Sequence, residues 1–315
     1  MEPIVKGRIG FMRLSLSLGG IALAVALASP ALAADKIKVG FITKFPVPYF
    51  ATMEDAAKEW GKAHPDVEII YGQGKNNDDI DGTIALIENM VAQGVKGIAI
   101  TPIDPSISKS LDKAIAAGVK VVLMDNDIPG WEGRSALATT NNREAGKIAG
   151  GYLKTVLKDG DKIGILDGKP EVVPLNDRVE GMLEGLSGVK VDIVGRGRTA
   201  CEPDKGQQVA EDILTAHPEL KAIYSACGPP AASAATAIKN AKLDHKVILV
   251  GFDFCCGEED AIAKGEEDAS VAQFPKKMSE FGLDGLIKAI KGEPVEKLID
   301  TGAALVTKAN MDQFK

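Results

Sequence analysis

Acidic side chains follow several of the predicted strands of this chain at the point where each strand ends. Asp125 and Asp127 come directly after the apolar stretch Lys120–Met124, and Asp253 comes after Val247–Phe252. Because the carboxyl ends of parallel strands meet at one edge of a sheet, ligands bind in the crevice beside them. Carboxylates in such a crevice accept hydrogen bonds from a polar guest. We therefore expect a binding crevice at these strand ends.

Catalytic groupings are missing from the sequence. It contains no Gly-x-Ser-x-Gly, no His-Glu-x-x-His and no Gly-x-x-x-x-Gly-Lys phosphate loop. The three histidines lie beside Pro65, Pro218 and Asp244, away from the strand ends, so we expect no metal site and no cofactor. We expect a binding protein rather than an enzyme, with an extracytoplasmic enzyme that uses the crevice as the alternative.

The elements that must position these residues are strands alternating with helices. Short apolar stretches predict strands at 37–42, 68–71, 97–101 and 120–124, and again at 162–166, 190–194, 222–225 and 247–252. Segments of helical period between them predict helices at 50–63, 79–93, 106–117, 142–157, 177–186, 205–216 and 231–241. This order predicts two successive α/β lobes, each with a doubly wound parallel sheet. A last helix at 275–291 and a strand-like tail at 303–307 are expected to recross between the lobes.

The N-terminus has the pattern of a secretory signal peptide. Basic residues precede the apolar stretch Leu14–Leu27, and Ala31-Leu32-Ala33 provides small residues for cleavage. A membrane anchor is the alternative, but the apolar stretch is shorter than the ~20 residues that span a bilayer. We expect residues 1–33 to be a signal peptide and the mature protein to be periplasmic.

The charge balance argues against nucleic acid as a partner. The sequence has 44 acidic and 37 basic side chains, which gives a net charge of -7. An acidic surface repels a phosphate backbone.

The four cysteines, Cys201, Cys227, Cys255 and Cys256, all lie in the C-terminal half of the sequence. Disulfides persist outside the cytoplasm, so we expect at least one. Four cysteines allow three full pairings, and the sequence does not choose among them. Cys227 with Cys201 or with Cys255 would stiffen the crevice wall; free buried thiols are the alternative.

Several motifs occur in the order typical of one family. They are Pro48-Tyr49-Phe50, the sequence NREAGKIAG from Asn142 to Gly150, Leu214–Pro218, Val250–Asp253 and Ala272–Pro275. From Lys36 to Thr307 the chain resembles the periplasmic sugar-binding proteins of the ribose-binding type, which serve ABC importers. The motifs are weak singly and specific as an ordered set.

The resemblance implies a type I periplasmic binding protein fold, in which three strands join the two lobes as a hinge. The hinge strands are expected near 140–141, 273–274 and 300–301. The first lobe would then comprise 35–140 plus 274–301, and the second 141–273 plus 302–315. The protein would be a monomer that delivers its ligand to a membrane ABC permease.

The resemblance also implies a set of ligand-binding residues. Aromatic rings would cover the sugar's C–H face, and charged groups would bond its hydroxyls. The implied residues are Tyr49, Phe50, Asp125, Asn126, Arg178, Cys201, Cys227, Asp253 and Gln273. Structural roles are the alternatives: core packing for the aromatic residues, turn capping for the aspartates, a solvated helix position for Arg178 and backbone bonding at the hinge for Gln273.

The chain departs from the ribose-type pattern where specificity is decided. Val47 stands where an asparagine is usual, Asn126 where an arginine is usual, and Cys201 and Cys227 where an aromatic residue and an asparagine are expected. These changes argue against ribose itself. A neutral monosaccharide or sugar alcohol is the expected ligand, with an amino sugar as the alternative because the cation usual at position 126 is lost.

Overall fold

The computed structural model of this chain describes residues 1–4, 7, 10, 36–170 and 172–314. Residues 36–315 form one compact unit, separate from residues 1–35. The predicted signal peptide, residues 1–33, lies almost entirely outside the described residues. Within the described parts of the chain, no helix is both long enough and apolar enough to cross a bilayer.

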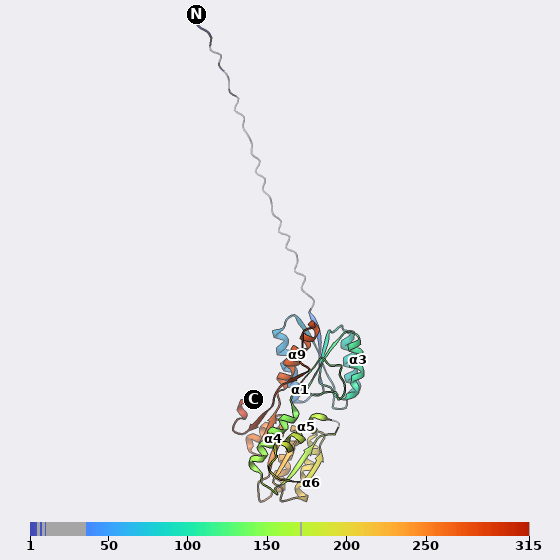
Figure 1. Cartoon of the computed structure of the whole chain (residues 1–315), viewed down its shortest axis with the longest axis vertical. Coiled ribbons are helices and arrows are strands. Elements are labelled where there is room, and N and C mark those ends of the chain that lie inside the picture. Colours follow the sequence, from blue (N-terminus) through green and yellow to red (C-terminus); the bar gives the residue numbers. More distant parts are fainter. Residues whose placement is uncertain (5–6, 8–9, 11–35, 171, 315) are drawn as a thin grey trace. The chain divides into compact units, whose positions relative to one another are not determined.

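Sheet A is the centre of the first lobe, and all its strands are parallel (Figure 1). Its strands are β1 (Ile37–Thr43), β2 (Val67–Gln73), β3 (Gly97–Ile100), β4 (Lys120–Met124), β5 (Ala136–Thr139) and β11 (Leu298–Asp300), in the order β11-β5-β4-β3-β1-β2. Helices α1 (Pro48–Ala63) and α9 (Pro275–Lys291) pack on one face. Helices α2 (Ile80–Ala92) and α3 (Ser108–Ala116), with a 3₁₀ turn at Pro105–Ile107, pack on the other.

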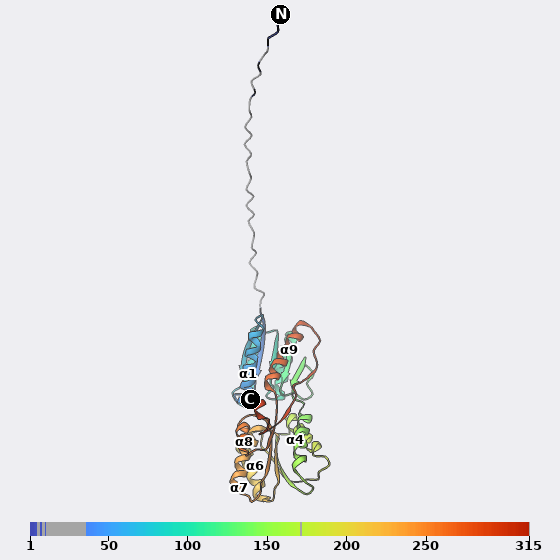
Figure 2. The same ribbon diagram turned by 90° about the vertical axis from the view of Figure 1, so that its left-hand side faces the viewer.

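Sheet B is the centre of the second lobe (Figure 2). Its strands are β6 (Lys162–Asp167), β7 (Asp192–Arg198), β8 (Ala222–Ser225), β9 (Ile248–Asp253), β10 (Ala269–Ala272) and β12 (Ala304–Thr307), in the order β12-β10-β9-β8-β6-β7. Helices α4 (Asn142–Val156) and α5 (Val173–Gly185) cover one face. Helices α6 (Pro203–Ala216), α7 (Gly228–Ala241) and α8 (Glu258–Lys264) cover the other, and a 3₁₀ turn at Met311–Gln313 ends the fold.

The predicted fold class, two α/β lobes built on parallel sheets, is confirmed. The sequence did not predict β5, β10, β11 and α8, and β12 pairs with β10 in the antiparallel direction. The missed strands are only three or four residues long, and alanine, which is depleted in strands, fills half of β5 and of β10. Pairing with neighbouring strands, rather than local preference, makes these segments extended.

The chain passes between the two sheets three times: from β5 to α4, from β10 to α9 and from β11 to β12. Two of these passages contact each other through Thr140 and Thr301, whose hydroxyl oxygens are 3.5 Å apart. The Asn141 N–H also donates to Asp300 Oδ1 at 3.2 Å. The predicted lobe boundaries, which depend on where these passages bend, stay predictions.

Glycines let α4 and α5 approach each other closely. A Cβ atom built at Gly146 would lie 2.3 Å from the carbonyl oxygen of Arg178, and one at Gly150 would lie 2.0 Å from that of Met182. Contacts this short leave room only for hydrogen. The spaced glycines of the NREAGKIAG segment therefore bring the start of α4, with Asn142, against the turn of α5 that carries Arg178.

A substitution at this helix contact should be costly. Gly150→Ala adds a methyl group against the Met182 carbonyl oxygen, so the helices must separate, and we expect the free energy of unfolding to fall by about 1–3 kcal/mol. Gly151→Ala is the matched control, because nothing lies within 4 Å of its Cβ position. Alanine there should stabilise the helix by up to ~1 kcal/mol. Urea unfolding compares the two; equal effects would contradict the close contact.

Two glutamates are buried together in the second lobe. Glu258 on α8 and Glu267, in the loop that precedes β10, are 0% and 1% exposed, and both reach over Gly251, where a Cβ atom would lie within 2.4 Å of each carboxyl group. Glu258 accepts hydrogen bonds from the Ser270 hydroxyl at 2.8 Å and from the Cys255 N–H at 3.0 Å. Buried carboxyl groups with no cation beside them favour the protonated form.

The pKa values of both glutamates are raised. Burial raises the pKa of Glu267 to about 8, and the nearby charges of Asp268 and Glu259 act in the same direction. Burial also raises the pKa of Glu258 well above its ordinary value, and the charges of Glu267 and Asp253 raise it further. The folded protein therefore keeps protons on this pair that the unfolded chain releases.

This pair should make stability depend on pH. The raised pKa values mean that the stabilisation is complete below the ordinary carboxyl pKa of 4.5 and is lost as the pH rises toward 8. We expect the free energy of unfolding to fall by roughly 1 kcal/mol per pH unit for each retained proton. Glu267→Gln should flatten this slope, whereas Glu266→Gln, at the half-buried neighbour that pairs with Lys239, should not. Denaturant unfolding from pH 5 to 8 measures the slopes. Identical slopes in all three proteins would count against a proton retained on Glu267.

Candidate ligand-binding site

Asp125 lies at the end of β4, with a backbone φ of 65° that turns the chain out of the sheet. The Thr139 hydroxyl donates to its carbonyl oxygen at 2.5 Å and so fixes this turn. The Tyr49 hydroxyl lies 3.2 Å from Asp125 Oδ1 and 3.3 Å from Met278 Sδ. Asp125 is 9% exposed, so its carboxylate needs partners at this position.

Lys44 supplies the positive charge beside Asp125. Its Nζ lies 3.5 Å from Asp125 Oδ2 and 5.7 Å from the centre of the Phe50 ring. The Asn126 amide fits between them when its nitrogen faces Asp125 Oδ2 at 3.1 Å and its oxygen faces Lys44 Nζ at 2.5 Å. Burial lowers the pKa of Lys44, and Asp125 opposes this shift.

Sequence reasoning missed Lys44 as a site residue. Its position directly after β1, at the carboxyl end of a predicted strand, was the available signal. The cation expected at Asn126 is thus present in space, but it comes from a different strand end.

The aromatic residues Tyr49 and Phe50 begin α1 and belong to the core of the first lobe. Their ring centres are 5.3 Å apart in an edge-to-face arrangement, and Phe45 packs edge-to-face on Phe50 in turn. Phe50 packs in the core, whereas the Tyr49 hydroxyl reaches Asp125. Burial, and then the negative charge of Asp125, raises the pKa of Tyr49, so its hydroxyl stays a donor.

Arg178 lies at the centre of the polar residues that the second lobe contributes to the site, and we call the group contributed by each lobe its wall. Its Nε donates to Asn142 Oδ1 at 2.8 Å, and its Nη1 donates to the Ala226 carbonyl oxygen at 2.9 Å and to Asp253 Oδ1 at 3.0 Å. The guanidinium group also lies 3.8 Å above the centre of the Phe252 ring. Arg178 is only 4% exposed, so it is a positioned cation and not a solvated helix residue.

Asp253 ends β9 and gathers three donors on its carboxylate. Besides Arg178, Gln273 Nε2 donates to Oδ1 at 2.6 Å and the Gly228 N–H donates to Oδ2 at 3.0 Å. Gly228 is the first residue of α7, so the carboxylate lies at the positive end of a helix. Gln273 lies on the passage from β10 to α9 and thus links Asp253 to the connection between the lobes.

Two carboxylates and two cations therefore balance each other in this region. Lys44 and Asp125 come from the first lobe, and Arg178 and Asp253 come from the second. The pKa values of Lys44 and Tyr49 both respond to the charges of Arg178 and Asp253, so the groups from the two lobes lie within electrostatic range of each other. The region carries no net charge from these four groups.

The cysteines pair within the second lobe. Cys201, after β7, and Cys227, before α7, have their sulfur atoms 2.06 Å apart, at the distance of a disulfide bond. Cys227 lies between Ala226, which accepts from Arg178, and Gly228, which donates to Asp253. The neighbours Cys255 and Cys256 pair with each other. Of the pairings that the sequence left open for Cys227, the structure has the one with Cys201, and the predicted disulfide stays a prediction.

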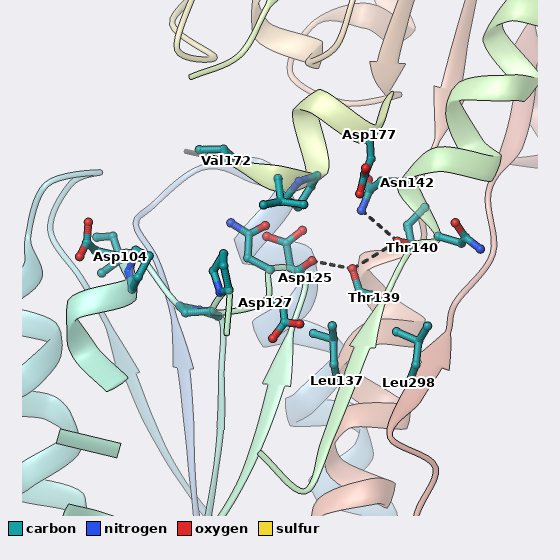
Figure 3. A pocket seen from close by; sticks show the side chains of 18 residues that line it. Asp104, Asp125, Asp127, Leu137, Thr139, Thr140, Asn142, Val172, Asp177 and Leu298 are labelled. Atoms are coloured by element: carbon teal, nitrogen blue, oxygen red, sulfur yellow. Dashed lines mark hydrogen bonds between the residues drawn. The ribbon is translucent and has the colours of Figure 1, made fainter. Parts of the chain in front are cut away.

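A hollow of about 280 Å³ opens between the lobes beside Asp125 (Figure 3). Asp125, Asp127, Thr139 and Leu298 line it from the first lobe, and Asn142, Val172 and Asp177 from the second. Of the implied ligand-binding residues it contains only Asp125 and Asn126. Tyr49, Phe50, Arg178, Cys201, Cys227, Asp253 and Gln273 lie outside its lining. Asp127 is paired with Arg134 at 2.9 Å, so it is not a free carboxylate in this hollow.

The fold and these two facing walls define a two-lobed binding protein. A sequence profile of the periplasmic binding protein domain matches residues 39–294. The chain belongs to this family, and the resemblance found in the sequence is confirmed.

Individual relatives are similar along most of their length. The D-ribose/D-allose-binding protein of Pseudomonas aeruginosa is 29% identical over 270 residues, which cover 82% of this chain and 85% of that protein. The ribose import binding protein of Escherichia coli is 26% identical over 298 residues, with 94% and 98% covered. A solute-binding protein of an ABC transporter from Burkholderia graminis, solved in complex with D-arabinose, has a TM-score of 0.80 at 28% identity, with 88% and 97% covered.

Proposed function

We propose that this protein is the periplasmic solute-binding component of an ABC importer and that it binds a neutral monosaccharide or sugar alcohol between its lobes. The family, the relative named for ribose and allose, and the similar structure solved with D-arabinose support this role. The main structural support for this proposal is the pair of walls, in which Asp125 and Asp253 are each held beside a cation.

The free hydrogen-bonding groups suit a hydroxyl-rich ligand. Arg178 Nη2 has no hydrogen-bond partner in the described part of the chain, so two charged N–H donors are available. The Lys44 ammonium group has three N–H donors. Two of them are directed at Asp125 and Asn126, which leaves one for a ligand. Each carboxylate keeps acceptor capacity as well. Hydroxyl groups, which both donate and accept, match this mixture.

The charge balance favours a neutral ligand over an amino sugar. The amino-sugar hypothesis depended on an unpaired negative charge left by Asn126, and Lys44 neutralises that charge. A second ammonium group would meet Lys44 and Arg178 and be repelled at low dielectric. The relatives give the amino sugar no support either, since their names refer to neutral sugars.

Binding should couple the two lobes. A sugar that bonds Asp125 on one side and Arg178 with Asp253 on the other stabilises the closed arrangement, because only that arrangement offers both sets of contacts. In this proposal the lobes comprise 35–140 plus 274–301 and 141–273 plus 302–315, and the passages between the sheets act as the hinge. The permease recognises the closed form of a monomer exported by its signal peptide. The site releases its ligand unaltered, uses no metal or cofactor, and binds no nucleic acid.

A thermal-shift screen tests the proposed function. We expect D-allose, D-arabinose or myo-inositol to stabilise the purified protein, by about 2.7 kcal/mol at a hundred times the dissociation constant. Glucosamine and galactosamine should give no shift, because their ammonium group meets the two cations. Stabilisation by amino sugars alone, or by no carbohydrate at all, would overturn the proposal.

Two lysine variants sharpen the same screen. Lys44→Met removes the buried cation with little change in length, and we expect about a tenfold or larger loss of affinity for the neutral sugar by calorimetry. Lys38→Met is the matched control, because Lys38 lies on β1, the strand that Lys44 follows, is exposed, and is remote from the strand's carboxyl end. Equal affinities in the two variants would remove Lys44 from the site.

A further inference from the structure

The turn that follows β9 has an unusual backbone and two adjacent cysteines. Asp253, Phe254, Cys256 and Gly257 all have positive φ angles, of 88°, 50°, 63° and 107°. Such angles disfavour residues with a side chain, so neighbouring contacts must hold the turn in place. Cys255 and Cys256, in the middle of this turn, are bonded to each other.

Loop closure cannot explain a bond between neighbouring residues. The bond between Cys201 and Cys227 spans 26 positions and restricts the unfolded chain, which is the usual source of disulfide stabilisation. The bond between Cys255 and Cys256 spans one position and closes almost no loop. Its effect is therefore local, on the shape of the turn itself.

The turn contacts the ligand-binding region and both lobes. Its first residue, Asp253, receives bonds from Arg178 and Gln273. Its middle residue, Cys255, packs against the core cluster of the first lobe that contains Tyr49 and Phe50. A change in the shape of this turn therefore changes the second lobe's carboxylate and its contact with the first lobe together.

Two hydrogen bonds tie the turn to the body of the second lobe. The Phe254 N–H donates to Ser270 Oγ at 3.1 Å, and the Cys255 N–H donates to Glu258 Oε2 at 3.0 Å. Ser270 and Glu258 are fully buried and bonded to each other. The cysteine pair itself is half-buried at the surface of the lobe, so a small reagent can reach it.

We propose that Cys255 and Cys256 form a thiol–disulfide switch that sets ligand affinity, an inference that rests on the proposed function. In the switching step a dithiol reductant supplies two electrons and two protons. The bond between the two sulfur atoms breaks, each sulfur becomes a thiol, and the dithiol becomes a disulfide. The disulfide form holds Asp253 in its binding position, and the dithiol form frees the turn.

The expected effect follows from the loss of a fixed binding conformation. If the reduced turn occupies the binding arrangement about one tenth of the time, the apparent affinity falls about tenfold. The folded state loses little stability, because the bond between neighbours restricts the unfolded chain very little. Affinity and stability should thus respond differently to reduction at this position.

The test measures sugar affinity by calorimetry before and after treatment with dithiothreitol. The probe is the sugar of the screening panel that gives the largest thermal shift. Alkylation and mass spectrometry identify which cysteines the reagent has reduced. We expect about tenfold weaker binding once Cys255 and Cys256 are reduced and while Cys201 and Cys227 remain bonded.

A double variant separates the two disulfides. Cys255→Ser with Cys256→Ser should bind the sugar as weakly as the reduced protein, should melt near the wild-type temperature, and should no longer respond to dithiothreitol. If this variant fails to fold, hydrogen exchange at the Phe254 and Cys255 amides of the native protein replaces it, with faster exchange expected after reduction. Equal affinity in both redox states, or a variant that still responds to the reductant, overturns the switch alone. Absence of any sugar binding by the oxidised protein overturns the proposed function and the switch with it.

Discussion

The burial of two carboxylates at strand ends is the constraint on which the site depends. Asp125 follows β4 and Asp253 ends β9, and each side chain is only 10% exposed. A carboxylate in such a place is tolerated only with donors and a cation around it. Lys44 and Arg178 meet this requirement, one in each lobe. A polar region without net charge results, and such a region can exchange water for a neutral, hydroxyl-rich guest.

The helices that support Arg178, α4 and α5, are held together by close backbone packing. Glycines at 146 and 150 let α4 lie against the carbonyl groups of α5, and this contact places Asn142 beside the Arg178 guanidinium. Arg178 then reaches Asp253 and the Ala226 carbonyl oxygen. The position of Arg178 therefore depends on this backbone contact. Bulkier residues at 146 and 150 would push α4 and α5 apart and separate Asn142 from the Arg178 guanidinium group.

Periodicity predicted most of this fold, because long amphipathic helices and β-branched strands carry their signal locally. The segments it missed, such as β5 and β10, are short and alanine-rich, and only pairing within the sheet makes them strands. Strand-end positions likewise pointed to Asp125 and Asp253. Lys44 was missed because, from the sequence alone, a lysine that follows a strand is expected to be exposed to solvent. Its burial arises only when β1 and β4 place it beside Asp125 in space.

The departures at Asn126 and Cys227 illustrate the same limit. Read singly, Asn126 signalled a lost cation, although the structure supplies that cation from β1. Cys227 signalled a disulfide without a unique partner, and the fold brings Cys201 next to it, with the two Cα atoms 5.7 Å apart. Such pairings depend on distances between segments far apart in the sequence, which periodicity does not encode.

A crystal structure of the protein with its best neutral sugar tests the central claim most directly. Our account requires the sugar to lie between the two walls, with its hydroxyl groups within hydrogen-bond distance of Asp125 on one side and of Arg178 or Asp253 on the other. A sugar that contacted only one lobe, or that lay away from both carboxylates, would contradict it.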